Sequence, residues 1–407
     1  MLSFMAKPTS FQCNIRCKYC FYLEKKDVVS GAASAPGKMS QAVLEAFIEK
    51  KITGTQEPEV YFTWQGGEPT LAGLAFYRQA VALQQYWAQK QGKTVHNAIQ
   101  TNGILLNDQW GKFLKQHNFL VGISIDGDEE LHNAYRLSNV NRGTWHKVIQ
   151  GIAILKKHQI PFNTLTVVNN LNVQHPLRVY QFLKQIGSRH MQFLPLLEAH
   201  APHPNLPAWM NNGLIVPPIQ AFSVPSRAYG EFMNRIFDCW IKQDIGTVAV
   251  QLFESLLGRY CGFEASMCIY QPECGGENLA LEANGDIYQC DHLVYPEMKI
   301  GNILTQQLDE IAANSQSLST RKQQLNSQCQ QCEFLALCHG GCPKHRLNLN
   351  AQLERHNYFC EGYKLIFKHT LPAMNFMATL KSQGLPADLV RHYLAEIGLG
   401  DAPVVTG

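Results

Sequence analysis

A chain of 407 residues, of which 45% are hydrophobic and 16% charged, is long enough for two or three packed domains, and this composition excludes intrinsic disorder. The 35 basic and 32 acidic residues leave a net charge of +3, which is too small to predict nucleic acid or an anionic membrane as the main partner. No apolar run approaches the roughly 20 residues that a membrane span needs, and the first residues, MLSFMAKP, show no secretory signal. We therefore expect a soluble, cytoplasmic protein with no nucleic-acid or membrane partner.

From the N-terminus to about residue 200, short β-rich runs alternate with longer amphipathic stretches. This alternation predicts βαβ units and a parallel sheet, and six repeats favour a closed or partial barrel over a flat sheet. The expected strands are 3–7, 60–64, 96–101, 120–125, 162–168 and 191–197. The expected helices are 40–51, 71–91, 107–117, 143–158 and 173–186.

Polar or glycine-rich residues stand at the ends of these strands. In chain order they are three cysteines, QGGEP, TNG, Ser124 with Asp126-Gly127, Asn169-Asn170, and Gln192 with Glu198. They can be read as ordinary turn residues. Six such ends in register, however, favour a functional site at the carboxyl edge of a barrel.

The second half of the chain loses this rhythm. Residues 199–226 are rich in proline and predict a long irregular connection, and Tyr229–Lys242 is helix-like. A cysteine-rich region with few periodic runs follows at 261–360, and a helical portion closes the chain at about 361–397. We therefore expect four parts: a barrel, a helical connection, a cysteine-rich domain and a C-terminal helical segment. Their bounds are 1–227, 228–260, 261–360 and 361–407.

The 13 cysteines are an odd number and fall into groups, with none between Cys20 and Cys239. A disulfide framework is not expected in a reducing cytosol, so clustered thiols predict metal binding. The first group, Cys13, Cys17 and Cys20, has the spacing CxxxCxxC. Three thiolates on one loop can hold three irons of a 4Fe–4S cube and leave the fourth iron open. Zinc would need a fourth ligand nearby, and there is none.

This spacing, with the aromatic Tyr19 before the last cysteine, resembles the radical S-adenosylmethionine (SAM) superfamily. In that superfamily SAM binds the open iron and is cleaved to a 5′-deoxyadenosyl radical, which abstracts hydrogen from unactivated carbon. GGEP resembles the segment that holds the SAM amino group, although GGEP alone is also a common tight turn. The resemblance implies a set of cofactor contacts, for which a surface ion pair of Arg136 and plain core packing of Leu197 are the alternatives. The implied contacts are Tyr19, Gly66, Gly67, Glu68, Ser124, Arg136 and Leu197.

The later cysteines include eight thiols that spacing alone cannot assign to partners. They are Cys268, Cys274, Cys290, Cys329, Cys332, Cys338, Cys342 and Cys360. A zinc ribbon built from Cys329, Cys332, Cys338 and Cys342 is one interpretation.

The same pattern is similar to the SPASM domain, which carries auxiliary clusters in radical SAM enzymes that modify proteins and peptides. That resemblance implies two interlocking sets, each holding a fully ligated 4Fe–4S cluster. One set is Cys268, Cys274, Cys290 and Cys342, and the other is Cys329, Cys332, Cys338 and Cys360. Cys239 and Cys261 stay outside both sets, and the apolar surroundings of Cys239 predict a buried thiol.

Over nearly its whole length the chain resembles the anaerobic sulfatase-maturating enzymes. The likeness rests on CNIRCKYCFYLEK, TWQGGEPTL, QTNGILL, GISIDG, YQCDHLVYP and CHGGCPKHR. That family oxidises a cysteine or serine of a sulfatase to Cα-formylglycine. The resemblance makes Asp291 the general base, which would remove the thiol or hydroxyl proton after hydrogen abstraction from Cβ, while an auxiliary cluster accepts the electron. A turn aspartate is the alternative for Asp291.

These resemblances imply a partial (β/α)6 radical SAM barrel, a SPASM domain and C-terminal helices. The implied cofactors are SAM and three 4Fe–4S clusters, one of which binds SAM. The implied partners are an unfolded sulfatase polypeptide with a Cys/Ser-x-Pro/Ala-x-Arg motif and a low-potential electron donor such as flavodoxin or ferredoxin, and we expect a monomer. Two other functions are open: a different SPASM-type peptide-modifying enzyme that forms a thioether or carbon–carbon crosslink, and a non-catalytic iron–sulfur sensor.

Overall fold

The structure is a computed structural model that describes residues 2–25, 37–199, 216, 218–274, 278–314, 321–350 and 352–399. Most of the proline-rich connection expected at 199–226 therefore lies outside the described residues. No helix in these ranges is both long and apolar enough to cross a bilayer.

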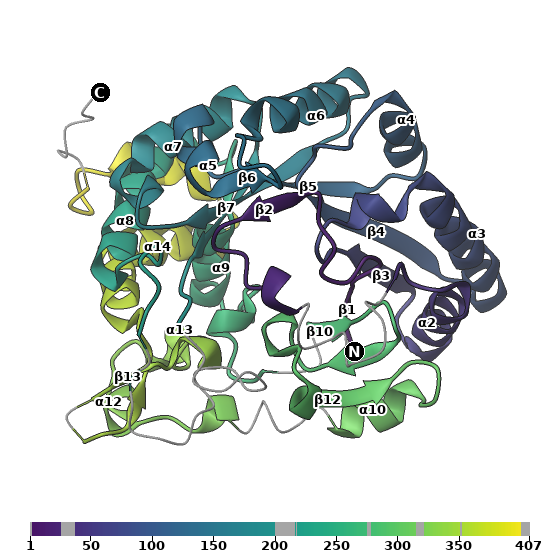
Figure 1. Ribbon diagram of the computed structural model, residues 1–407. Helices are drawn as coiled ribbons and strands as arrows, with labels where there is room; N and C mark the ends of the chain where they lie inside the picture. The colour runs from purple at the N-terminus through teal and green to yellow at the C-terminus, as the bar shows by residue number, and fades with distance from the viewer. Residues whose placement is uncertain are drawn as a thin grey trace.

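The described ranges contain one large, mostly parallel sheet that curves around the N-terminal loop (Figure 1). Its strand order is β12-β11-β10-β1-β3-β4-β5-β7-β8-β9, and the sheet is open because β12 and β9 end it on either side. The parallel strands are β1 (Phe4–Ala6), β3 (Glu59–Trp64), β4 (Thr94–Thr101), β5 (Leu120–Ser124), β7 (Phe162–Val168), β8 (His190–Pro195), β9 (Ala249–Val250) and β10 (Leu279–Leu281). All six strands expected in the first half are present, and the predicted parallel partial barrel is confirmed.

Helices cover the outer side of this sheet (Figure 1). Some of them begin at a polar side chain that caps free backbone N–H groups: the Ser40 side chain accepts from Val43 N–H, and the Asn107 side chain accepts from Gln109 and Trp110 N–H. The five helices expected from the sequence are present, with ends that differ by up to three residues. The barrel helices are α2 (Gln41–Gly54), α3 (Leu74–Gln91), α4 (Asp108–Gln116), α5 (Glu129–Tyr135), α6 (Trp145–Lys157), α7 (Pro176–Gln185), α8 (Ser226–Gln243) and α9 (Gln251–Tyr260).

Two short strands tie the N-terminal loop to the barrel. Strand β2 (Ile15–Cys17) pairs antiparallel with β6 (Arg136–Ser138), so that Cys17 lies opposite Arg136. Neither strand follows from the sequence pattern, because each has only three residues. The pairing nevertheless decides which side chains meet at the mouth of the barrel.

The cysteine-rich region continues the barrel sheet. Strand β10 pairs parallel with β1, and β11 (Asp286–Tyr288) and β12 (Lys299–Asn302) add to it as an antiparallel meander. The sheet also continues at its other end, where β9, within the expected connecting segment 228–260, pairs with β8. One hydrogen-bonded sheet thus contains strands from three of the four expected parts: the barrel, the connecting segment and the cysteine-rich region.

The rest of the cysteine-rich region is built from short elements, and one long helix follows it. The short elements are α10 (Leu308–Asn314), α12 (Ser327–Gln330), α13 (Leu335–Cys338), β13 (Asn348–Leu349) and β14 (Arg355–His356), with 3-10 turns at Cys268–Tyr270, Asp291–Leu293, Pro296–Met298 and Pro343–His345. Helix α14 (Cys360–Ser382) packs beside α8. The two helices approach so closely that a Cβ at Gly362 would overlap the Ser226 carbonyl oxygen.

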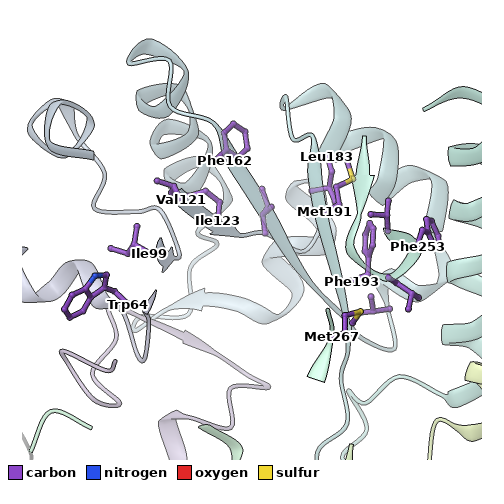
Figure 2. Packing of buried hydrophobic residues seen from close by; sticks show 14 of the residues in the cluster. Trp64, Ile99, Val121, Ile123, Phe162, Leu183, Met191, Phe193, Phe253 and Met267 are labelled. Carbon is purple, nitrogen blue, oxygen red and sulfur yellow. The ribbon is translucent and has the colours of Figure 1, made fainter. Parts of the chain in front are cut away.

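A single large apolar cluster lies between the sheet and its helices. Strand β7 shows why: its residues alternate between buried and half-buried, as expected for a strand with a core face. Figure 2 shows the cluster extending along successive strands. Its labelled members include Trp64, Ile99, Val121, Ile123, Phe162, Met191 and Phe193.

Candidate functional site

The three N-terminal cysteines lie on a segment that forms hydrogen bonds with the GGEP residues after strand β3. Gly67 N–H donates to the Ser10 carbonyl (2.7 Å), and Glu68 N–H donates to the Gln12 carbonyl (2.8 Å). A Cβ at Gly67 would overlap the Gln12 carbonyl oxygen, so only glycine permits this approach. The GGEP segment and the cysteine loop therefore form one surface.

Glu68 is buried, and its carboxylate is occupied by the protein itself. One oxygen accepts hydrogen bonds from Thr70 N–H (3.0 Å), Thr70 Oγ1 (2.6 Å) and Thr101 Oγ1 (2.6 Å), and the other accepts from Asn102 N–H (2.8 Å). The four bonds join the ends of strands β3 and β4. This carboxylate thus acts on the site by holding two loops together.

Arg136 enters the site through a buried network. Its Nη1 donates to the Tyr19 hydroxyl (3.0 Å) and lies 4.0 Å from Asp126 Oδ1, and the Tyr19 hydroxyl donates to Asp126 Oδ2. Burial raises the pKa of Asp126, although the Arg136 charge opposes this. The Arg136 Nε is buried and has no hydrogen-bond partner among the residues that the structure describes. An unpaired guanidinium N–H at this position fits a site that receives an anionic group.

The N-terminal cysteine loop, the GGEP segment and Arg136 line a cavity of about 150 Å³. Ser124, which accepts a hydrogen bond from Gln100 (3.0 Å), also lines it. Leu197 does not belong to the lining and packs in the apolar core instead. The sequence-predicted residues that line the cavity are Cys13, Cys17, Cys20, Tyr19, Gly66, Gly67, Glu68, Ser124 and Arg136.

The thiols at this cavity suit a metal cluster better than free cysteine chemistry. Burial raises the pKa of Cys13 and of Cys17 to about 12, and it also raises the pKa of Cys20. Such thiols stay protonated at neutral pH unless a metal replaces the proton. Three thiols that line one cavity fit a 4Fe–4S cluster with one open iron.

The eight later thiols fall into two groups. In the first, burial raises the pKa of Cys268 to about 12 and that of Cys274 to about 11, and the charge of nearby Cys342 adds to both shifts. The pKa of Cys290 is raised as well, first by burial and also by Cys274 and Cys342. Thus Cys342 joins the first three later cysteines, although it follows Cys338 closely in the sequence.

The second group surrounds a small cavity of about 30 Å³. Cys329, Cys332, Cys338 and Cys360 all line it, and Cys342 does not. Burial raises the pKa of Cys338 to about 12, and Cys360 and Cys329 raise it further. The two groups coincide with the two interlocking sets that the resemblance implied, and the zinc-ribbon grouping is not the one brought together.

Each group presents four thiols, which fit a fully ligated cluster. Within the described ranges, no three His, Cys, Asp or Glu side chains are grouped as ligands of a single metal ion. Cys239 is buried on α8, as expected, where its thiol donates to Gln243 Oε1 (3.7 Å).

Asp291 begins the 3-10 turn after Cys290, and its side chain is 20% exposed. Its Oδ1 lies 3.5 Å from the Cys290 sulfur, and its Oδ2 lies 3.7 Å from Lys7 Nζ. Burial raises the pKa of Asp291, whereas His292, Lys7, the hydrogen bond from Cys290 and Lys344 together lower it to about 2. The carboxylate is therefore ionised and stands where the cysteine-rich region meets the end of β1.

Several residues at this junction escape sequence reasoning. Lys7 follows β1 and contacts Asp291, and Lys344 pairs with Glu198 (2.5 Å) across the junction. Among the auxiliary thiols, the buried Lys322 donates to the Cys268 carbonyl (2.9 Å). Only Glu198 carried a signal, as a polar residue at a strand end; the pairings of the three lysines span too much sequence to predict.

Family comparisons agree with this arrangement. Residues 8–183 match the radical SAM superfamily, and residues 268–333 match SPASM, an iron–sulfur cluster-binding domain. A serine-type anaerobic sulfatase-maturating enzyme of Bacteroides thetaiotaomicron is 39% identical over 95% of this chain and 94% of its own length. A cysteine-type anaerobic sulfatase-maturating enzyme of Clostridium novyi is 32% identical over 93% of this chain and 97% of its own.

Solved structures give the same result. The native anSMEcpe structure with bound AdoMet and Cp18Cys peptide matches with a TM-score of 0.81 at 29% identity, over 93% of this chain and 99% of that one. SuiB of Streptococcus suis, bound to its precursor peptide SuiA, matches with a TM-score of 0.56 at 14% identity, over 88% of this chain and 74% of that one. The second match is a likeness of fold alone.

Proposed function

This chain belongs to the anaerobic sulfatase-maturating enzymes, radical SAM enzymes that convert a cysteine or serine of a sulfatase to Cα-formylglycine, and we propose that Asp291 is its general base. The observation that carries this role is the position of the Asp291 carboxylate. It stands beside the first auxiliary set through Cys290 and, through Lys7, touches the segment that lines the first cavity. A base at this junction can reach a side chain presented between the two.

We propose that the first cavity binds SAM on the cluster held by Cys13, Cys17 and Cys20. The backbone carbonyls of Gly66 and Gly67 accept from its amino group, and Arg136 with Ser124 contacts its polar groups. Tyr19 supports Arg136 by hydrogen bonding. Glu68 acts through the loops that it joins, and Leu197 acts only as core behind the site.

The bound cofactors supply one-electron chemistry: abstraction of a hydrogen atom from the target Cβ, then acceptance of one electron. Asp291 takes the proton from the target hydroxyl or thiol, so that serine loses two hydrogens in all and becomes the aldehyde. Cysteine loses the same two hydrogens, and the thioaldehyde is hydrolysed. The Phe21 ring packs against His292 beside Asp291, and Tyr22 lines the first cavity.

We propose that the two groups of four cysteines hold the two auxiliary clusters of the SPASM domain, within residues 261–360. The set with Cys290 adjoins Asp291 and is the nearer acceptor for the electron. The partners are an unfolded sulfatase segment with a Cys/Ser-x-Pro/Ala-x-Arg motif and a low-potential donor such as flavodoxin or ferredoxin. We place this chemistry in the cytoplasm, where thiols stay reduced, and assign it to a monomer.

The test is anaerobic incubation of the reconstituted protein with SAM, a strong reductant and two sulfatase peptides, one with serine and one with cysteine at the target position. We expect about 12 irons per chain, release of 5′-deoxyadenosine (called deoxyadenosine below), and an aldehyde in at least one peptide by mass spectrometry. A peptide with alanine at the target position is the control and stays unmodified. About four irons with zinc at the later cysteines, or deoxyadenosine without aldehyde in either peptide, contradicts the proposal.

A further inference from the structure

Lys7 is a buried lysine at the junction of the two cysteine regions, and no sequence motif includes it. Its side chain is 2% exposed. Its backbone is held on both sides, because its N–H donates to the Leu281 carbonyl (2.8 Å) on β10 and its carbonyl accepts from Ser10 N–H (3.0 Å). The residue thus joins the barrel strand β1 to the cysteine-rich region and to the N-terminal cysteine loop.

The ammonium group of Lys7 faces Asp291. Nζ lies 3.7 Å from Asp291 Oδ2, and within the described ranges this is the one carboxylate at ion-pair distance from it. It also lies 4.7 Å from the centre of the Tyr22 ring, which lines the first cavity. Burying a charge is costly unless the charge is paired, so this pairing accounts for a lysine at such a position.

The stem of Lys7 contacts the segment that we assign to SAM binding. A Cβ at Gly66 would lie 3.2 Å from Lys7 Cδ and 3.3 Å from Lys7 Cβ, which shows that the two residues already pack together. One side chain therefore touches the cofactor segment with its methylenes and Asp291 with its charge. Few other arrangements could fix the distance between these two parts of the site.

Lys344, another cation near Asp291, is engaged elsewhere. Lys344 makes its ion pair with Glu198 at 2.5 Å and lies 4.9 Å from the centre of the Phe21 ring. Lys7 has no such second carboxylate within the described ranges, and its separation from Asp291 exceeds a hydrogen bond. Lys7 can therefore hold the carboxylate in place while leaving an oxygen lone pair for the target side chain.

We propose that Lys7 is a positioning residue that holds the Asp291 carboxylate at a fixed distance from the SAM-binding segment. This inference rests on the proposed role of Asp291 as the base. Deprotonation of the target must occur beside the carbon that has lost hydrogen, and a displacement of about 1 Å in such a site can cost about 100-fold in rate. Without Lys7, SAM cleavage continues, and fewer cleavages end in formylglycine.

The test compares Lys7→Met with the wild-type reconstituted enzyme. We expect unchanged iron content and SAM affinity, continued deoxyadenosine release, and a formylglycine yield that falls about 10- to 100-fold. Lys7→Arg, which keeps the charge, restores part of the yield. The double variant Lys7→Met/Asp291→Asn yields no less formylglycine than Asp291→Asn alone, and its loss of melting temperature is smaller than the sum of the two single losses.

The matched control is Lys51→Met. Lys51 is also buried and lies near an aromatic ring, that of Phe4. Its Nζ, however, donates to the backbone carbonyl of Leu2 and not to a side-chain carboxylate. This variant should keep the wild-type ratio of formylglycine to deoxyadenosine. An unchanged ratio in Lys7→Met, or the same lowered ratio in Lys51→Met, overturns the proposal.

Two further outcomes separate this inference from the proposed function. If Lys7→Met loses iron, Lys7→Gln takes its place, because glutamine keeps a polar contact without the charge; a wild-type ratio in an iron-replete Lys7→Gln overturns the proposal. If Asp291→Asn itself keeps full formylglycine yield, the base is wrong and the positioning role falls with it. If Asp291→Asn loses formylglycine yield while Lys7→Met keeps the wild-type ratio of formylglycine to deoxyadenosine, only the role of Lys7 is refuted.

Discussion

The barrel and the cysteine-rich region place their thiols by different means. In the barrel, Cys17 lies in a strand paired with Arg136, and the loop around it hydrogen-bonds to the GGEP segment. In the cysteine-rich region, Cys268 lies in a 3-10 turn and Cys338 ends a four-residue helix. The two-stranded pairing of β2 with β6 and the hydrogen bonds to the GGEP segment after β3 thus order the first set, whereas short turns hold Cys268 and Cys338 of the later ones. Loss of the metal should therefore abolish the chemistry of the barrel while leaving its fold intact. In the later region, loss of the metal should also unfold part of the structure.

The largest effect is expected in the barrel. Replacing Cys13, Cys17 and Cys20 together by alanine should abolish deoxyadenosine release, because no thiolates remain to hold the open-iron cluster. The melting temperature of the barrel should change little, since the sheet and its apolar core are intact. Cys261→Ala, a cysteine outside all three sets, is the control and should release deoxyadenosine normally. Unfolding of the triple variant would contradict the expectation that the barrel keeps its fold without its cluster.

A single change in the later region should have a broader structural effect. Cys338→Ala removes one ligand of the set that lines the second cavity, and about four of about 12 irons should be lost. Limited proteolysis should then cut within 327–360 faster than in the wild type, because this set of ligands joins short elements. Formylglycine should fall sharply while deoxyadenosine release persists. Full iron content, or protease resistance equal to that of the wild type, would contradict the distinction between the two regions.

A smaller effect sharpens the account of the barrel. Asp126 does not line the cavity, but it holds Tyr19 and Arg136. Asp126→Asn keeps the shape and removes the charge, so SAM should bind about 10- to 100-fold more weakly, or about 1.4–2.8 kcal/mol. Equilibrium binding of SAM to the iron-loaded variant measures this. Asp108→Asn, on the barrel surface beside Lys157, serves as the control and should bind SAM as the wild type does.

The same contrast explains how far the sequence could predict the structure. Alternating strands and helices predict the barrel, because short β-rich runs separated by longer amphipathic stretches are typical of βαβ units. The strand ends also predict most of the cavity lining. The antiparallel meander after β10 is not among the predicted elements, although Asn284-Gly285 between apolar residues is a hairpin signal. It lies in the cysteine-rich region, where long periodic runs are few.

Other features could not be read from local pattern. The partners of Glu68 come from a neighbouring strand end, so a carboxylate expected to meet the cofactor proves to hold two loops together. The pairing of Lys7 with Asp291 joins residues that are distant in sequence, and no periodicity encodes it. The grouping of eight thiols into two sets likewise depends on tertiary structure. Resemblance to a known family, and not spacing, anticipated that grouping.

The most direct test of the account is the yield of both products from Asp291→Asn with a sulfatase peptide. Asparagine keeps the size of the side chain and cannot accept the target proton. We predict the wild-type iron content, deoxyadenosine release close to that of the wild type, and a formylglycine yield at least about 100-fold lower. An aldehyde yield equal to that of the wild type would show that the cysteine-rich region does not supply the base.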